Sequence, residues 1–468
     1  MIIDWKESHA FLTDDVSPPP ITTFNGCNMK TNYSFGRDTL SAKDVKHSLG
    51  LSGTFALWLG ANVVVTTILT GMLLVPDLNF SIAMSSVAIG SIIGAIPLVL
   101  VGLMGQRTGL PSMVLTRRAY GPIGSRAISL VNMCVLIAWS WIQALLAGMS
   151  LNYAIESTTG YSNLPLMTIL CEVVVVLIVL RGHIGIERVE RWAALVMMGL
   201  AALVLYQLNK HYDVSMLLDM PAENRNGITL GIAFDIVIAT AFSWISSSAD
   251  YNRNCKSGVI AVWGTWAGYV LAAIVAMGLG AVVSGLSVLN GMDQTYDPTR
   301  LLSGFGFGLP AALVIFFSVM TTNVMAVYSA TLSCMNVAPS MTFWKPALVI
   351  GMVTVFGALI PGILDQFQNF LLIIGALFIP AFSVMVADYY LVGKEGYDEG
   401  LLTATQQQGR STAFIAIGSY LIGATLAAYW TLLDPLPFGA SLPVFIITGA
   451  LYWLGASVLV KTPVESYK

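Results

Sequence analysis

Apolar stretches alternate with short polar segments along most of this chain after residue 50. A helix crosses the ~30 Å hydrocarbon core of a bilayer with roughly 20 apolar residues, and twelve stretches have about that length. The pattern predicts an all-α integral membrane protein with twelve transmembrane helices. The predicted spans are residues 52–75, 81–105, 127–154, 164–181, 190–208, 228–249, 258–290, 309–335, 344–364, 369–392, 412–432 and 438–460.

Residues 1–50 differ from the rest, because they are polar and contain three consecutive prolines. They lack the apolar core of a secretory signal, so we expect a polar tail ahead of the first span. Of the 22 Lys and Arg residues, nineteen fall on the side of the twelve-span arrangement that holds this tail, and only Lys210, Arg225 and Arg300 fall on the other. This bias predicts a multi-pass protein of the plasma (inner) membrane with both termini in the cytosol.

Composition limits the classes of function. With 56% hydrophobic and 10% charged residues, the chain has too little polar surface for a soluble protein of 468 residues. The net charge is -3 and the basic residues are scattered, so no nucleic-acid-binding patch is indicated. The five cysteines form no CxxC pair and the four histidines lie outside the predicted spans. We therefore expect no cofactor, no structural metal and no enzyme activity.

Two predicted spans contain helix-breaking composition. The first carries Gly60 and Asn62 in the run LGANVVVTT, and the sixth carries SWISSSAD at residues 243–250. In a five-plus-five inverted repeat these spans correspond, and discontinuous helices at such places expose carbonyls that bind a substrate and a cation. Alternatively, Gly60 only allows close packing, and the serines bond back to their own helix.

Hydroxyl groups cluster on one face of the eighth span, where Ser318, Thr321 and Thr322 lie three and four residues apart. Small hard cations prefer oxygen ligands, so a cation site is one interpretation. Hydrogen bonds between helices are the other.

Trp139 and Gln143 in the third span are four residues apart and point the same way. An indole offers a stacking face and an amide offers both a donor and an acceptor, which suits a planar heterocycle. A tryptophan belt and an interhelical glutamine are the alternative.

Two acids, Glu172 and Asp235, also lie in spans, where each is a candidate proton relay, although Asp235 is close enough to a span end to be solvated.

Four segments in order resemble the nucleobase-cation symporter family, in its purine-cytosine permease branch. They are GQRTGLPSMVLTRRAYG at 105–121, SSSADYNRN at 246–254, TTN at 321–323 and IPAFSVMVADYYLV at 379–392. The resemblance implies a LeuT-like fold in which residues 51–208 form the first repeat, residues 228–392 form the second, and residues 393–468 add two peripheral helices and a short cytosolic end.

The resemblance also implies a site. It assigns base binding to Trp139 and Gln143, together with the sixth-span residues Ala241, Phe242, Ser243, Trp244 and Ser246. It assigns sodium binding to Gly60 and Val63 with Ser318, Thr321 and Thr322. The chain departs from the family pattern at Ala241, where relatives carry a second stacking aromatic, and at Val327, where some carry asparagine. Either Phe242 or Trp244 replaces that aromatic, or the pocket is larger and accepts a bulkier or different heterocycle.

These features predict a symporter that imports a nucleobase or a related planar heterocycle across the lipid bilayer together with a cation, which we expect to be sodium. Proton coupling through Asp235 or Glu172 is the first alternative, and a membrane sensor that binds the same ligand without transport is the second. The oligomeric state is not predicted.

Overall fold

The computed structural model describes residues 40, 42, 45, 47–223, 225, 227–292, 308–360, 362–393 and 410–459. Within these residues the chain is helical, and the one isolated β-bridge pairs Leu49 with Cys255. The predicted tail at residues 1–50 lies almost entirely outside the described residues, as does the C-terminal end after residue 459.

Each predicted span coincides with a described helix, and the first coincides with a pair. The helices are α1 (Leu51–Asn62), α2 (Val65–Leu74), α3 (Phe80–Thr108), α4 (Ser112–Thr159), α5 (Leu164–Val179), α6 (His183–His211), α7 (Leu230–Asn252), α8 (Gly258–Leu289), α10 (Gly308–Val337), α11 (Trp344–Ala358), α12 (Phe367–Ala387), α14 (Arg410–Leu432) and α15 (Ser441–Leu459), with short turns at Val214–Leu217, Ile363–Gln366 and Asp388–Val392. Helix α4 starts well before the predicted span, because a short helix precedes it across a kink at Gly121 (φ 68°, ψ 173°).

Length and composition support most of the predicted spans. Among the described helices, eight are long and apolar enough to cross a membrane, and the bent pair of α1 and α2 makes a ninth. Helices α5 and α11 are apolar but shorter. The total of twelve spans therefore stays a prediction.

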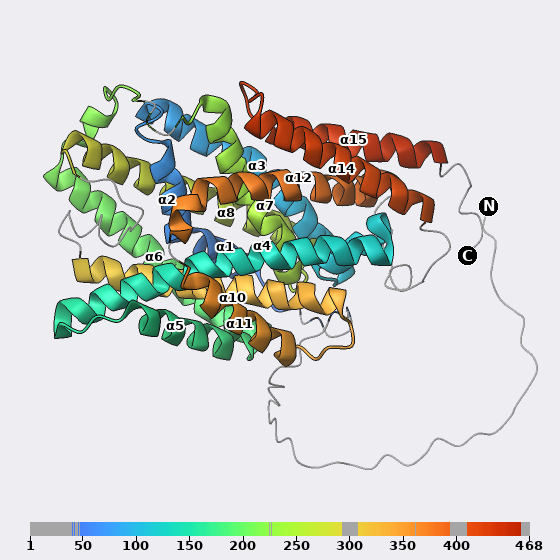
Figure 1. Ribbon diagram of the computed structural model, residues 1–468, viewed down its shortest axis with the longest axis horizontal. Coiled ribbons are helices and arrows are strands. Elements are labelled where there is room, and N and C mark those ends of the chain that lie inside the picture. The colour runs from blue at the N-terminus through green and yellow to red at the C-terminus, as the bar shows by residue number, and fades with distance from the viewer. Residues whose placement is uncertain are drawn as a thin grey trace, which may run out of the picture. The chain divides into compact units, whose positions relative to one another are not determined.

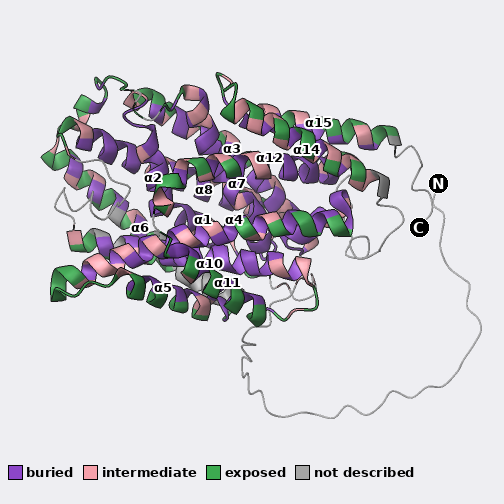
Figure 2. Cartoon of the chain, in the orientation of Figure 1, coloured by how far each residue is buried: buried purple, intermediate pink, exposed green. Residues whose placement is uncertain are grey.

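Two groups of helices position the site. Helices α1, α2 and α3 pack against α8, and α3 also packs along α7, while α4 packs along α10, α5 and α11. The two groups meet where α4 contacts α7 and where α10 contacts α1. Buried residues concentrate on the inner helices α7, α8 and α10, and exposed residues on outer ones such as α5 (Figures 1 and 2).

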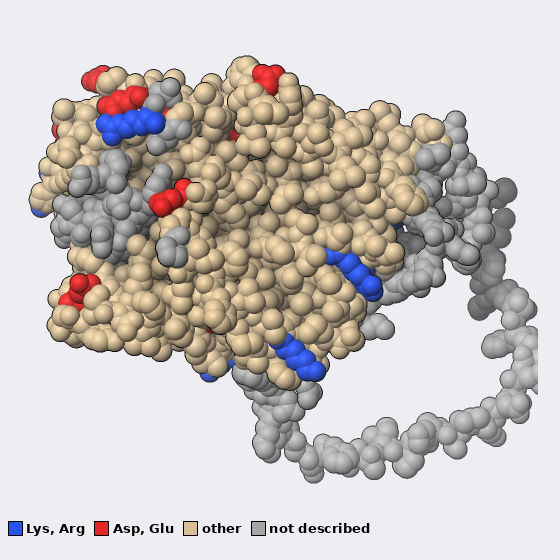
Figure 3. Space-filling model, in the orientation of Figure 1, with Lys and Arg blue, Asp and Glu red and all other residues tan. Residues whose placement is uncertain are grey.

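Helices α14 and α15 lie together at one edge, against α12 (Figure 1). Their apolar stretches are only 22% and 28% buried, against 83% for α8. The exposed side chains include Phe414 and Leu421. In Figure 3 charged side chains are few, and most of the surface shown is uncharged. An apolar surface of this extent fits contact with lipid, as predicted for peripheral helices.

The chain bends by 56° between α1 and α2, close to the predicted interruption at Gly60 and Asn62. Helical hydrogen bonds stop where Val63 N–H donates to the Leu59 carbonyl (2.9 Å), and they resume where Ile68 N–H donates to the Val64 carbonyl (3.1 Å). Val64 between them is extended (φ -131°, ψ 156°). The carbonyls of residues 60–63 thus have no partner in their own helix.

The predicted break in the sixth span is wrong, because α7 runs as one helix from Leu230 to Asn252. Two of its serines make hydrogen bonds without opening the backbone. Ser243 Oγ donates to the Thr240 carbonyl (2.7 Å), and Ser248 Oγ donates to the Leu98 carbonyl in α3 (2.7 Å).

Close packing explains why small residues fill this part of α7. A Cβ placed on Gly102 of α3 would lie 2.7 Å from Ser248 Oγ, and one on Gly105 would lie 2.5 Å from the Ala249 Cα. Side chains larger than serine or alanine would push the helices apart, so the serine-rich stretch serves helix packing.

Candidate functional site

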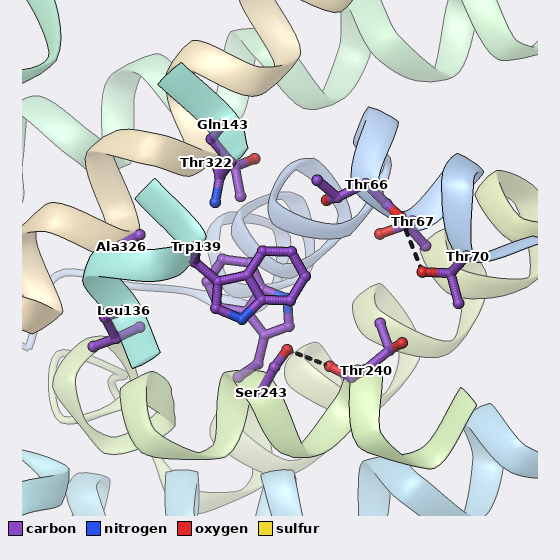
Figure 4. A pocket seen from close by; sticks show the side chains of 11 residues that line it. Thr66, Thr67, Thr70, Leu136, Trp139, Gln143, Thr240, Ser243, Thr322 and Ala326 are labelled. Carbon is purple, nitrogen blue, oxygen red and sulfur yellow. Dashed lines mark hydrogen bonds between the residues drawn. The ribbon is translucent and has the colours of Figure 1, made fainter. Parts of the chain in front are cut away.

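A pocket lies between α2, α4, α7 and α10. Its empty space, which includes a part open to solvent, is about 410 Å³. The lining residues are Thr66, Thr67, Thr70, Leu136, Trp139, Gln143, Thr240, Ser243, Trp244, Thr322 and Ala326. None of these described residues is charged, and six of them carry hydroxyl groups. In Figure 4, Trp139 lies at the centre, with Gln143 and Thr322 on one side and the threonines of α2 on the other.

Trp139 and Gln143 share the pocket-facing side of α4, as predicted from their spacing, together with Leu136. Both are buried, and among the described residues neither Trp139 Nε1 nor Gln143 Oε1 has a hydrogen-bond partner. Phe367 and Phe370 contact the indole edge-on, with ring centroids 6.0 and 5.1 Å away. The pocket thus presents a fixed ring with one free donor and one free acceptor beside it.

Helix α7 contributes Thr240, Ser243 and Trp244 to the opposite wall. The Trp244 ring is held edge-on by Trp58, with centroids 6.1 Å apart and planes at 88°. Trp244 is therefore the second pocket aromatic that the sequence leaves open between two residues. Phe242 does not line the pocket, because its ring packs on Phe445 of α15 (5.7 Å).

The remaining predicted α7 residues also lie outside the pocket lining. Ala241 faces α3, where a Cβ on Gly94 would be 3.0 Å from the Ala241 Cβ. Ser246 is fully buried. Of the five predicted residues in α7, the structure brings only Ser243 and Trp244 to the pocket.

Sequence reasoning missed Thr66, Thr67 and Thr70 of α2. The hydroxyl of Thr70 donates to the Thr66 carbonyl (2.9 Å), which satisfies its proton and leaves its lone pairs available. The run VTTILT, with three threonines inside an apolar span, was the available signal. Its orientation depends on the 56° bend, which the sequence does not reveal.

The five predicted cation ligands gather where α1 ends against α10. Ser318 Oγ donates to the Val63 carbonyl (3.2 Å). Thr321 Oγ1 and Thr322 Oγ1 both donate to the Ser318 carbonyl (2.9 and 3.1 Å). Gly60 belongs to the same helix end, where carbonyls lack helical partners, and all five residues are buried. The group consists of carbonyl and hydroxyl oxygens, the chemistry that suits Na⁺.

Thr322 belongs to both groups, because it lines the pocket and also donates to Ser318. One side chain therefore adjoins the space for a ligand and the oxygen cluster at the end of α1. A ligand that moves this side chain would act on the oxygen cluster directly.

The two predicted relay acids have different surroundings. Asp235 caps the start of α15, since its carboxylate accepts from Ala440 N–H (2.8 Å), Ser441 N–H (2.8 Å) and Ser441 Oγ (2.6 Å). Glu172 accepts from Asn323 Nδ2 (2.8 Å), beside Thr322. Asp235 therefore anchors a peripheral helix, whereas Glu172 lies next to the candidate site.

Comparisons with known proteins agree with this architecture. A putative purine-cytosine permease of Bacillus subtilis (strain 168) is 23% identical over 360 residues, which are 72% of this chain and 75% of that protein. The cytosine permease of Escherichia coli (strain K12) is 24% identical over 414 residues, covering 85% and 89%.

A solved structure shares the fold. It is that of Mhp1, a nucleobase-cation-symport-1 family transporter, in a closed conformation with bromovinylhydantoin bound. It matches with a TM-score of 0.79 at 19% identity, over 92% of this chain and 97% of that one. The predicted resemblance is thus confirmed at the level of fold.

A family model described as permease for cytosine/purines, uracil, thiamine and allantoin matches residues 46–455. The matched region includes every helix from α1 to α14 and most of α15. The relatives that match are permeases, in agreement with the expectation that the chain is not an enzyme. This chain belongs to the family of membrane permeases for cytosine/purines, uracil, thiamine and allantoin.

Proposed function

We propose that this protein is a secondary-active symporter that imports an uncharged nucleobase, or a related planar nitrogen heterocycle, together with sodium. The observation that carries the proposal is the shared position of Thr322 between the pocket and the oxygen cluster. In a symporter the two ligands must affect each other's binding, and a common contact residue provides a direct route.

The pocket supports a neutral planar substrate. The indoles of Trp139 and Trp244 offer stacking faces, and base–aromatic stacking contributes about 1–3 kcal/mol per base. Trp139 Nε1 and Gln143 Oε1 are a donor and an acceptor without partners among the described residues, so each is free to bind a polar ring atom. With no charged residue in the lining, a cationic substrate such as thiamine lacks a counter-charge.

The oxygen cluster supports sodium as the coupling ion. The proposed ligands are the carbonyls of Gly60, Val63 and Ser318 with the hydroxyls of Thr321 and Thr322. Each threonine hydroxyl donates its proton to the Ser318 carbonyl, which leaves its oxygen lone pairs available to a cation. We further propose that the protein lies in the plasma membrane with both termini in the cytosol, from the distribution of Lys and Arg.

Proton coupling is a second candidate. Glu172 is buried and accepts a hydrogen bond from Asn323, the residue that follows Thr322. Uptake of radiolabelled cytosine, adenine, uracil and hydantoin into proteoliposomes separates the two. We expect at least one of these compounds to accumulate under an inward sodium gradient. Its accumulation should stop when monensin collapses that gradient. Liposomes with the Trp139→Ala variant serve as the control. Accumulation that follows only a pH gradient would favour the proton, and binding without accumulation would identify a sensor.

A further inference from the structure

Glu172 is a buried carboxyl in α5 that belongs neither to the pocket nor to the oxygen cluster. Only 1% of the residue is exposed. An ionisable side chain in a membrane helix is costly, by about 2.5–3.5 kcal/mol or more when charged at the bilayer centre. Such a group is retained where its contacts serve a purpose.

Those contacts form a chain across three helices. Asn323 Nδ2 in α10 donates to Glu172 Oε2 (2.8 Å), and Ser140 Oγ in α4 donates to Asn323 Oδ1 (2.5 Å). Ser140 and Asn323 are as buried as Glu172. Both ends of the Asn323 amide are thereby used, which fixes its orientation.

The two residues linked to Glu172 by these hydrogen bonds each directly follow a residue of the proposed site in the sequence. Ser140 comes directly after Trp139, and Asn323 comes directly after Thr322. The chain therefore joins the backbone that carries the pocket indole to the backbone that carries the shared threonine. A shift of α4 against α10 would break the Ser140–Asn323 hydrogen bond, so the chain holds the two backbones in register.

The second carboxyl oxygen, Oε1, takes no part in this chain of hydrogen bonds. Among the described residues Glu172 Oε1 has no partner, and α11 covers it, since a Cβ on Gly351 would lie 3.9 Å away. The function of Glu172 therefore rests on one acceptor oxygen. A carboxamide supplies the same acceptor, whereas an alkyl side chain does not.

We propose that Glu172 is a positioning residue that couples base binding at Trp139 to cation binding at Thr322, by holding Asn323 and through it Ser140. The inference rests on the proposed symport function. Removing the acceptor leaves the Asn323 amide a buried donor without a partner. The amide then turns, and each of the two helices adjusts to its own ligand without the other.

The test measures coupling in the full-length protein. The dissociation constant of the tightest binder among tritiated cytosine, adenine, uracil and hydantoin is measured in choline chloride and in sodium chloride at equal ionic strength. The dissociation constant in choline chloride divided by that in sodium chloride is the coupling factor. We expect Glu172→Gln to keep the parent factor within about twofold, and Glu172→Leu to lower it toward 1.

Two further variants keep the test decisive. Ser140→Ala breaks the chain at its other end and should lower the coupling factor even if Glu172→Leu folds poorly, as judged from its melting temperature. Thr168→Val, one turn earlier on α5, alters a buried hydroxyl that has no partner among the described residues, and should keep the factor. A purely structural role for Glu172 would change the melting temperature and leave the factor alone.

The outcomes separate the inference from the proposed function. Parental coupling in both Glu172→Leu and Ser140→Ala would overturn the inference, as would loss of coupling in Glu172→Gln, since the carboxyl's proton would then be what matters. A parent protein that binds a base equally well with and without sodium would instead contradict sodium symport.

Discussion

The hydroxyl of Ser318 in α10 donates to the carbonyl oxygen of Val63, the residue at which α1 ends, over 3.2 Å. This contact joins the eighth predicted span to the break in the first. It places a helix end whose last carbonyls lack partners in their own helix against the two threonine hydroxyls that donate to the Ser318 carbonyl. The cation site that we propose depends on this contact.

Substitutions at Thr321 and Thr322 should distinguish effects on cation binding from effects on base binding. Thr321 lies outside the pocket lining, so Thr321→Val should raise the half-saturating sodium concentration about tenfold, by loss of one oxygen ligand, and leave base affinity in choline unchanged. Thr322→Val should weaken both. Sodium titrations of base binding check this, with Thr321→Ser as the control. Equal sodium affinity in Thr321→Val and the parent would exclude this hydroxyl as a ligand.

The two aromatic residues on α7 should differ. Trp244→Ala removes a pocket wall and should weaken base binding by about 1–3 kcal/mol. Phe242→Ala should leave base affinity near that of the parent and lower the melting temperature, because this ring packs on Phe445. Binding assays and thermal unfolding of the two variants distinguish them. A large affinity loss in Phe242→Ala alone would place the ligand on the other side of α7.

Gln143→Leu should lower base affinity without lowering the stability of the ligand-free protein. Gln143 Oε1 is buried without a partner among the described residues, so replacing the amide with an alkyl group should preserve or raise the melting temperature of the ligand-free protein. Base affinity should fall about tenfold, through loss of a hydrogen bond to the base. Thermal shifts with and without base report both effects. A variant that binds bases as the parent does would remove Gln143 from the site.

Asp235→Asn tests whether this acid relays protons. Its carboxylate accepts three hydrogen bonds at the start of α15, so the variant should lower stability by about 1–2 kcal/mol, as loss of a helix cap does. Uptake and its dependence on pH should remain parental. The measurement is proteoliposome uptake over a range of external pH, beside thermal unfolding. Abolished uptake in a well-folded variant would return Asp235 to the transport mechanism.

Much of the helical framework was predictable because membrane spans follow from apolar length alone. The predicted span 258–290 is α8 (Gly258–Leu289), and 309–335 is α10 (Gly308–Val337). The pair Trp139 and Gln143 was also predictable, since helical spacing by itself sets a shared face. The family resemblance was carried by short ordered motifs and is confirmed.

The predictions that were wrong or incomplete concern features that depend on contacts with another helix. A serine-rich stretch is compatible with an unwound segment and with an intact helix. Here the glycines of α3 pack closely on Ser248 and Ala249, and α7 is an intact helix. The partner of Asp235 is Ser441, 206 residues later, which no local pattern indicates. The threonines of α2 were missed because a bend, and not their spacing, turns them to the pocket.

The central claim is that a base in the pocket and sodium at the oxygen cluster bind cooperatively through Thr322. The most direct measurement is the dissociation constant of the transported base in sodium chloride and in choline chloride at equal ionic strength. The account predicts that sodium tightens base binding at least about fivefold, the lower end of typical coupling between sites. Equal dissociation constants in the two salts would contradict it.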